Sequence, residues 1–162
     1  MMNDDLSRRP VARASGSERR LKPHPSPVTQ SFSWPIRVYY EDTDSGGVVY
    51  YANYLKFLER ARTEWLRALG FGQSELAARD LAVFVVRSVA IDYLKPSWFD
   101  DNLQVTVELV KVGASQMVVA QQVLREGEVL VTAEVKVACV DAQTFKPVRI
   151  PRAIVTRMGM AP

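Results

Sequence analysis

Residues 42–70 read DTDSGGVVYYANYLKFLERARTEWLRALG, a turn followed by a helical pattern. The turn carries two adjacent glycines, which can adopt a positive φ. From about Asn53 to Leu69, apolar residues recur at steps of three and four, which predicts one amphipathic helix that ends at Gly70. The apolar positions of this helix are Tyr54, Phe57, Leu58, Ala61, Trp65, Leu66 and Leu69.

Strand signals flank the helix on both sides. Residues 35–40 alternate like a short strand before it. Four further runs of strand character follow it, at 83–94, 103–109, 117–123 and 129–139. Glu126-Gly127 predicts a hairpin turn between the last two runs. A sheet with one apolar face needs a covering layer. We therefore predict an α+β hotdog fold, an antiparallel sheet wrapped around one central helix.

The charge of the 162-residue chain is unevenly distributed. Residues 1–33 hold six of the 21 Lys and Arg residues and three of the 18 Asp and Glu residues, which leaves 15 of each in 34–162. A neutral folded body argues against nucleic acid as a partner. The first segment is rich in Ser, Arg and Pro and has no hydrophobic period. We predict a disordered basic tail at 1–33 and a single hotdog domain at 34–162.

The sequence also bears on the compartment. A single cysteine, Cys139, cannot form an intramolecular disulfide, which fits a reducing environment. No run approaches the roughly 20 apolar residues of a membrane span. The first 33 residues lack the apolar core of a secretory signal. We expect a cytoplasmic protein.

The sequence excludes several kinds of catalytic site. The only histidine, His24, lies in the predicted tail, so a Ser-His-Asp or Cys-His arrangement in the folded domain is excluded. Cys139 occupies an apolar strand position and is expected to be a core residue. Clusters of zinc ligands and glycine-rich phosphate loops are absent from the sequence. We expect no metal and no cofactor, and any catalysis must use carboxylates, hydroxyls, backbone dipoles or Lys and Arg.

The turn before the helix offers such groups. Asp44 lies in a glycine-containing turn, and the helix begins several residues later. The first N–H groups of a helix have no internal acceptor and lie at the positive end of its dipole. A carboxylate and free N–H groups are a minimal set for acyl transfer, since one attacks or activates water and the others stabilise an oxyanion. The alternative is that Asp44 forms an Asx turn and the glycines only shape the loop.

The same residues carry a family resemblance. The run 40–55, YEDTDSGGVVYYANYL, and the run 59–64, ERARTE, resemble the 4-hydroxybenzoyl-CoA thioesterase family, closest to its Tol–Pal system-associated acyl-CoA thioesterase branch. The similarity extends through DYLKP at 92–96 and DDNL at 100–103. It implies a thioester hydrolase acting on acyl-CoA, whose coenzyme A is part of the substrate. It also implies a homo-oligomer, a dimer that builds the site between subunits, and commonly a homotetramer as a dimer of dimers.

The resemblance assigns roles to individual residues. It implies that Asp44 is the catalytic carboxylate, as nucleophile or general base, and that the N–H of Tyr51 polarises the thioester carbonyl. The Tol–Pal branch usually has histidine at the position of Tyr51, whereas the hydroxybenzoyl-CoA branch can have tyrosine there. The backbone role survives that difference. The substrate-binding candidates are Gly47, Val48, Tyr50, Asn53, Tyr54 and Glu59.

Several candidates have structural alternatives. We predict that Asn53 caps the helix, and the alternative is that it orients the loop. Glu59 either positions a water molecule or pairs with Arg62 or Thr63 on the same helix. The aromatic candidates either line an acyl pocket or pack in the core; they are Tyr50 and Tyr54. The candidates for contacts with coenzyme A phosphates are Arg87, Lys95 and Lys111.

Two other functions compete with the thioesterase. A hotdog hydratase or dehydratase is disfavoured because that chemistry typically uses histidine, and the predicted domain has none. A non-catalytic module that binds acyl groups or scaffolds an envelope-associated Tol–Pal complex stays open, with inner-membrane or acyl carrier protein partners. The presence of Asp44 in the motif favours the enzyme, because a binding module does not need a carboxylate beside a thioester.

Overall fold

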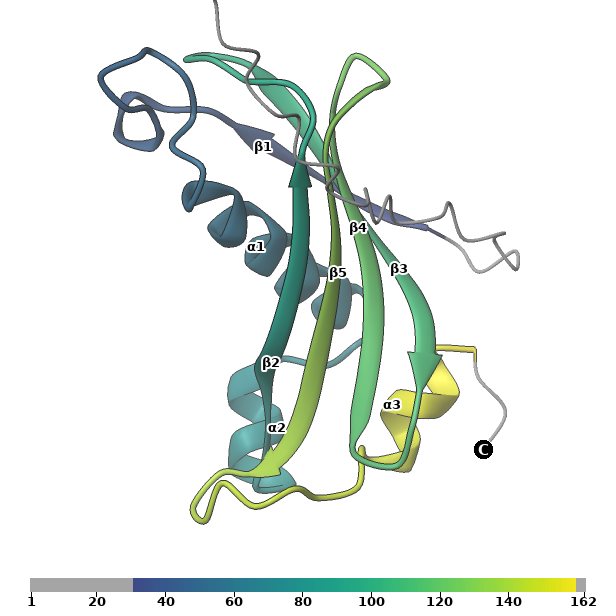
Figure 1. The fold of residues 1–162 in the computed structure, drawn as a ribbon. Helices are drawn as coiled ribbons and strands as arrows, with labels where there is room; N and C mark the ends of the chain where they lie inside the picture. The colour runs from purple at the N-terminus through teal and green to yellow at the C-terminus, as the bar shows by residue number, and fades with distance from the viewer. Residues whose placement is uncertain (1–30, 160–162) are drawn as a thin grey trace, which may run out of the picture.

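The protein folds around one curved antiparallel sheet (Figure 1). The computed structural model describes residues 31–159, so most of the predicted tail lies outside the described residues. The strand order is β1-β3-β4-β5-β2. The strands are β1 (Phe32–Arg37), β2 (Ala82–Tyr93), β3 (Asn102–Val112), β4 (Gln116–Arg125) and β5 (Glu128–Asp141).

Helix α1 (Asn53–Ala68) covers the inner face of the sheet. Its apolar stripe is buried against the central strands, with Phe57 and Ala61 fully buried. Val119 and Val135 face it from β4 and β5 and are fully buried as well. This burial holds the helix on the sheet, as expected for an amphipathic helix. The predicted central helix and its bounds are therefore confirmed to within one residue.

The structure differs from the predictions at strand β1 and at two short helices. β1 begins at Phe32, which pairs with Val107, so the sheet starts two residues before the predicted domain boundary. The short helices α2 (Gln73–Arg79) and α3 (Arg152–Arg157) were not predicted. Each has at most two turns and only one buried residue, which gives too few apolar positions to show a helical period.

The hairpin turn between β4 and β5 is formed by the two residues predicted for it, Glu126 and Gly127. Glu126 and Gly127 both have positive φ, 50° and 83°, as the predicted two-residue turn requires.

Strand β2 lies at an edge of the sheet, paired only with β5, and its residues 86–90 are exposed. A long exposed edge is a surface on which another strand can pair. Within residues 31–159, no helix is long and apolar enough to cross a membrane.

Candidate active site

Asp44 lies in a short loop, residues 43–49, which we call the acidic turn. Thr43 and Val49 form an antiparallel bridge, and the N–H of Asp44 donates to the Val48 carbonyl at 2.9 Å. Asp44 Oδ1 accepts a hydrogen bond from the N–H of Gly46 at 2.7 Å, which is an Asx turn. Its other carboxylate oxygen, Oδ2, accepts no hydrogen bond within the described range. The turn thus orients the exposed carboxylate and leaves one oxygen free.

The start of α1 presents two free N–H groups. The N–H of Tyr50 donates to the Asp42 carbonyl, and the N–H of Asn53 donates to the Tyr50 carbonyl, each at 2.8 Å. Between them, the N–H groups of Tyr51 and Ala52 have no acceptor within residues 31–159. Ala52 is the N-cap residue and already has helical angles, φ −70° and ψ −22°. These donors therefore lie at the positive end of the helix dipole.

Asn53 does not cap the helix, so that prediction was wrong. It is the first helical residue, and no side chain caps α1. A residue at that position cannot take the N-cap role, which belongs to the residue before it. The buried Asn53 side chain instead donates from Nδ2 to the Asp42 carbonyl at 2.9 Å. It orients the chain that leads into the acidic turn, which was the alternative.

The loop between β2 and β3 contacts both halves of the site. The Ser97 carbonyl accepts from the N–H of Val49 at 2.8 Å. The Ser97 hydroxyl lies 2.7 Å from the Tyr54 hydroxyl, and both side chains are buried. Trp98 forms a backbone bridge with Val48. This loop therefore fixes the spacing between the acidic turn and the helix start.

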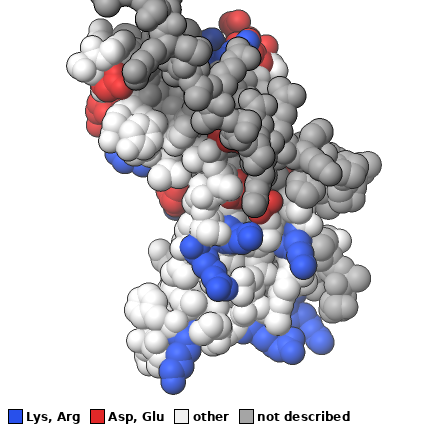
Figure 2. All heavy atoms as spheres, in the orientation of Figure 1, with Lys and Arg blue, Asp and Glu red and all other residues white. Residues whose placement is uncertain are grey.

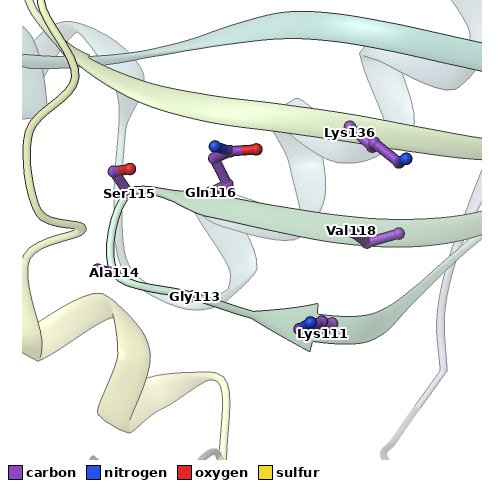
Figure 3. A pocket seen from close by; sticks show the side chains of 7 residues that line it. All are labelled: Lys111, Gly113, Ala114, Ser115, Gln116, Val118 and Lys136. Carbon is purple, nitrogen blue, oxygen red and sulfur yellow. The ribbon is translucent and has the colours of Figure 1, made fainter.

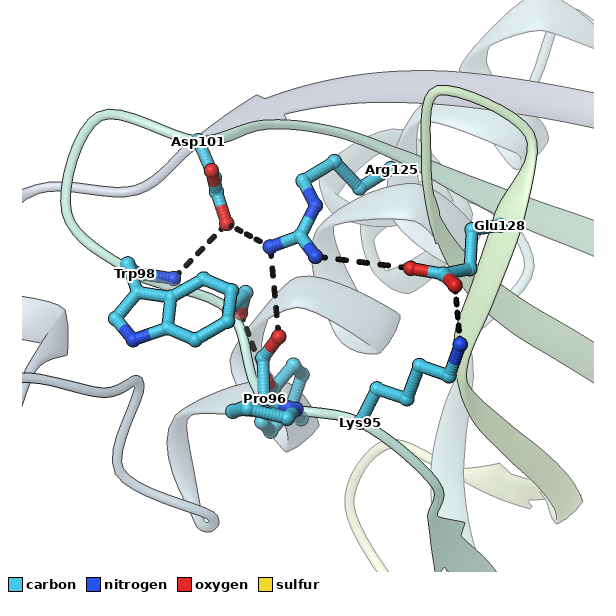
Figure 4. A network of polar contacts seen from close by, with 8 residues as sticks. Lys95, Pro96, Trp98, Asp101, Arg125 and Glu128 are labelled. Atoms are coloured by element: carbon cyan, nitrogen blue, oxygen red, sulfur yellow. Dashed lines mark hydrogen bonds and ion pairs between the residues drawn. The ribbon is translucent and has the colours of Figure 1, made fainter.

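Arg125, at the end of β4, holds the same loop in place (Figure 4). Its Nη1 donates to Asp101 Oδ2 at 2.8 Å, and the N–H of Trp98 donates to the same oxygen at 2.9 Å. The guanidinium lies 4.8 Å from the Trp98 ring centre, a cation–π distance. Arg125 also pairs with Glu128, which in turn pairs with Lys95. Lys95 is thus engaged in an ion pair.

The aromatic candidates divide into a buried and an exposed set. Tyr54 is 3% exposed and packs in the core. Tyr50 and Tyr51 are exposed beside the acidic turn, with ring centres 4.7 Å apart. The neighbouring Tyr51 side chain, and to a lesser extent burial and the charge of Asp44, raise the pKa of Tyr50. Its phenol therefore stays protonated near the carboxylate. Tyr93, which was not a candidate, joins this exposed set.

Glu59 pairs within its own helix. Its carboxylate accepts a hydrogen bond from the Thr63 hydroxyl at 2.6 Å, which is the structural alternative. It is six residues after Asn53, or about 9 Å along the helix. There it borders a small cavity of about 80 Å³ between α1 and strands β2, β4 and β5. The structure therefore places Glu59 away from the helix start.

The remaining phosphate candidates lie elsewhere. Lys111 and Lys136 line a cleft of about 370 Å³ beside the β3–β4 turn (Figure 3). That turn is at the opposite end of the sheet from the start of α1 (Figure 1). Figure 2 shows Lys and Arg, but no Asp or Glu, over the lower part of this face. Neither lysine forms an ion pair within the described part of the chain. Arg87 is exposed on the edge strand.

Cys139 is the single cysteine of the chain. Cys139 is fully buried in the core, as predicted, and burial raises the pKa of its thiol. A thiol in that environment is a poor nucleophile. Within residues 31–159, no group of three or more His, Cys, Asp or Glu side chains is placed to hold a metal ion.

Comparisons with known proteins define the class and then the family. The hotdog arrangement of sheet and helix is shared with a solved probable thioesterase from Bartonella henselae, at a TM-score of 0.72 and 35% identity, over 75% of this chain and 99% of that one. Residues 38–158 match the Thioesterase-like superfamily. The chain belongs to this superfamily.

Two relatives of named activity are more similar to this chain in sequence. The acyl-CoA thioesterase YbgC of Haemophilus influenzae is 49% identical over 127 residues, 78% of this chain and 93% of that protein. The acyl-CoA thioester hydrolase YbgC of Escherichia coli O6:H1 is 46% identical over 128 residues, 78% of this chain and 95% of that protein. The predicted hotdog fold and the predicted enzyme class, a thioester hydrolase, are confirmed.

Proposed function

We propose that the protein hydrolyses acyl-CoA thioesters to a free acid and coenzyme A. The observation that carries the proposal is the pairing of two features. Asp44 has one free carboxylate oxygen, and the N–H groups of Tyr51 and Ala52 are free at the start of α1. Relatives that are named acyl-CoA thioesterases support coenzyme A as the carrier.

Asp44 would act in one of two ways. As a nucleophile, its free oxygen attacks the thioester carbon, the C–S bond breaks, and the coenzyme A thiolate leaves and takes up a proton. Water then cleaves the resulting mixed anhydride to the acid and restores Asp44. As a general base, Asp44 takes a proton from water while the water oxygen attacks the carbon, and the departing thiolate is protonated.

Both routes place negative charge on the thioester oxygen. The N–H of Tyr51 would donate to that oxygen, where fixed donors stabilise the transition state more than the ground state. Tyr50 and Val48 are proposed substrate contacts, because Val48 lies in the acidic turn, Tyr50 lies between that turn and the helix start, and neither residue is fully buried. The buried Tyr54 would support the helix start from the core.

We further propose that two copies pair through strand β2. The edge exposes residues 86–90 along one side of the sheet, and Val86 and Val89 are among the exposed apolar residues. Light scattering of the full chain is expected to give a multiple of its 18.2 kDa, a dimer or a dimer of dimers. A mass of one chain would contradict this proposal.

A panel of acyl-CoAs tests the activity directly. Short-chain, long-chain and aromatic acyl-CoAs are incubated with the protein, and free thiol is measured. Turnover of at least one of them is expected, and the panel names the preferred acyl class. If no thioester is hydrolysed, the enzyme proposal fails and a non-catalytic acyl-binding module takes its place.

Gly46 offers a test of how finely the carboxylate is placed. A Cβ at Gly46 would lie 3.1 Å from Asp44 Oδ1, a tight contact that the carboxylate must relieve by moving. Displacement by a few tenths of an ångström is expected to lower kcat by about tenfold in Gly46→Ala, with little change in Tm.

The matched variant for that experiment is Gly47→Ala. A Cβ there meets nothing within 4 Å, but Gly47 has a φ of +78°. Alanine at that φ is expected to cost about 1 kcal/mol of folding free energy. Thermal melts and initial rates of both variants separate the two effects. An unchanged kcat in Gly46→Ala would contradict the proposed placement of Asp44.

A further inference from the structure

Tyr93, on strand β2, contacts the start of helix α1. It is the last residue of β2, and its hydroxyl donates to the Tyr51 carbonyl at 3.0 Å, across 42 residues of sequence. Its ring meets the Tyr51 ring edge-on, with centres 6.2 Å apart, and lies 5.7 Å from the Tyr54 ring. The end of the edge strand is therefore tied to the peptide that leads into α1.

The hydroxyl acts on a particular peptide group. The Tyr51 carbonyl and the Ala52 N–H belong to one planar trans peptide, so they point in opposite directions. A bond that holds the carbonyl therefore also sets the direction of the N–H. Donation to a carbonyl in addition polarises the amide and strengthens its N–H as a donor. Like the N–H of Tyr51, the N–H of Ala52 has no acceptor within the described residues.

We propose that Tyr93 is a positioning residue of the oxyanion site, acting through the Tyr51–Ala52 peptide. Its hydroxyl aims and polarises the Ala52 N–H, which then serves as a second donor to the thioester oxygen beside the N–H of Tyr51. The role rests on the proposed thioesterase function. It adds a group, remote in sequence, on which the stabilisation of the oxyanion depends.

The Tyr93 hydroxyl is protonated at neutral pH. Burial, followed by the charges of Tyr51 and Tyr54, raises the pKa of Tyr93 above its ordinary value. The hydroxyl is therefore a neutral donor at neutral pH. Its hydrogen bond to the carbonyl is then independent of pH near neutrality.

The kinetic test uses Tyr93→Phe, which removes only the hydroxyl. Loss of a direct oxyanion donor typically costs a hundredfold or more in kcat. An indirect effect is smaller, and we expect kcat to fall by about tenfold, with KM within about twofold of the wild type. The matched control is Tyr40→Phe, because the Tyr40 ring stacks on Phe99 and its hydroxyl has no hydrogen-bond partner within the described residues. Its kcat is expected to match the wild type.

A spectroscopic readout separates positioning from simple support of the fold. An acyl-CoA with a ¹³C-labelled carbonyl is bound to Asp44→Asn, and its carbonyl stretch is recorded by infrared difference spectroscopy. The stretch is expected at a lower frequency than in solution, and adding Tyr93→Phe should return it partway to the solution value.

The outcomes are distinct. An unchanged kcat in Tyr93→Phe, or a lower kcat together with a lower Tm and an unchanged carbonyl band, would overturn the role of Tyr93 and leave the thioesterase intact. Absence of turnover by the wild type would overturn the proposed function, and the role of Tyr93 with it.

Discussion

Asp44→Asn is expected to lower kcat for acyl-CoA hydrolysis by a hundredfold or more, in the range of a lost catalytic group. The amide is nearly the same size as the carboxylate, and its oxygen can still accept the hydrogen bond from the N–H of Gly46. The acidic turn should therefore keep its shape. What disappears is the charge on the free oxygen, which both proposed routes require as a nucleophile or as a base.

The measurement is thiol release with the best substrate of the acyl-CoA panel, followed to several turnovers. Asp100→Asn is a suitable control, since Asp100 is also an exposed loop aspartate, and its side chain only pairs with Arg37 at the surface. That variant is expected to retain wild-type kcat. An Asp44→Asn protein within a few-fold of the wild type, with the same Tm, would remove Asp44 from the chemistry.

The central helix and the acidic turn could be predicted because their signals are local. A helical period over 16 residues and two adjacent glycines are visible in a short window of sequence. The roles proposed for Asp44 and Tyr51 likewise depend on groups close in the chain. Asn53 shows the limit of such reasoning. Its residue type suits a cap, but one position along the helix its side chain reaches the Asp42 carbonyl instead.

The supports of the site could not be predicted from the sequence. Ser97, Tyr93 and Arg125 reach the acidic turn and the helix start only through the sheet and its loops. Each is an ordinary residue of its strand or loop in a sequence window, with no period or spacing that points to the site. Their contacts depend on strand register and on the path of the β2–β3 loop. A three-dimensional structure is needed to find them.

A polar pair between α1 and β4, Arg62 and Gln121, could not be predicted from the sequence either. Gln121 is 1% exposed, in an inward-facing position of β4 between Val119 and Val123. Its Oε1 accepts a hydrogen bond from Arg62 Nη1 at 2.7 Å, and its Nε2 donates to the Leu58 carbonyl at 3.1 Å. Burial lowers the pKa of Arg62, which is the sign of a cation held where water cannot fully solvate it. Gln121 therefore replaces part of the lost solvation.

Gln121→Leu is expected to lower the free energy of unfolding by about 2–4 kcal/mol, because it leaves the Arg62 cation without its hydrogen-bond acceptor. Urea titration followed by circular dichroism measures the change. Gln122→Leu is the matched control, since the neighbouring side chain is exposed on the outer face. Its effect is expected to stay within about 0.5 kcal/mol.

The double variant Arg62→Met with Gln121→Leu decides the cause. If the loss comes from a partly buried cation that has lost its acceptor, removing that cation as well should restore most of the stability, because an apolar pair of similar volume replaces the polar one. If the loss comes instead from poor packing of leucine at position 121, the double variant will be at least as unstable as the single one. A single variant within about 0.5 kcal/mol of the wild type would show that water solvates Arg62 at little cost.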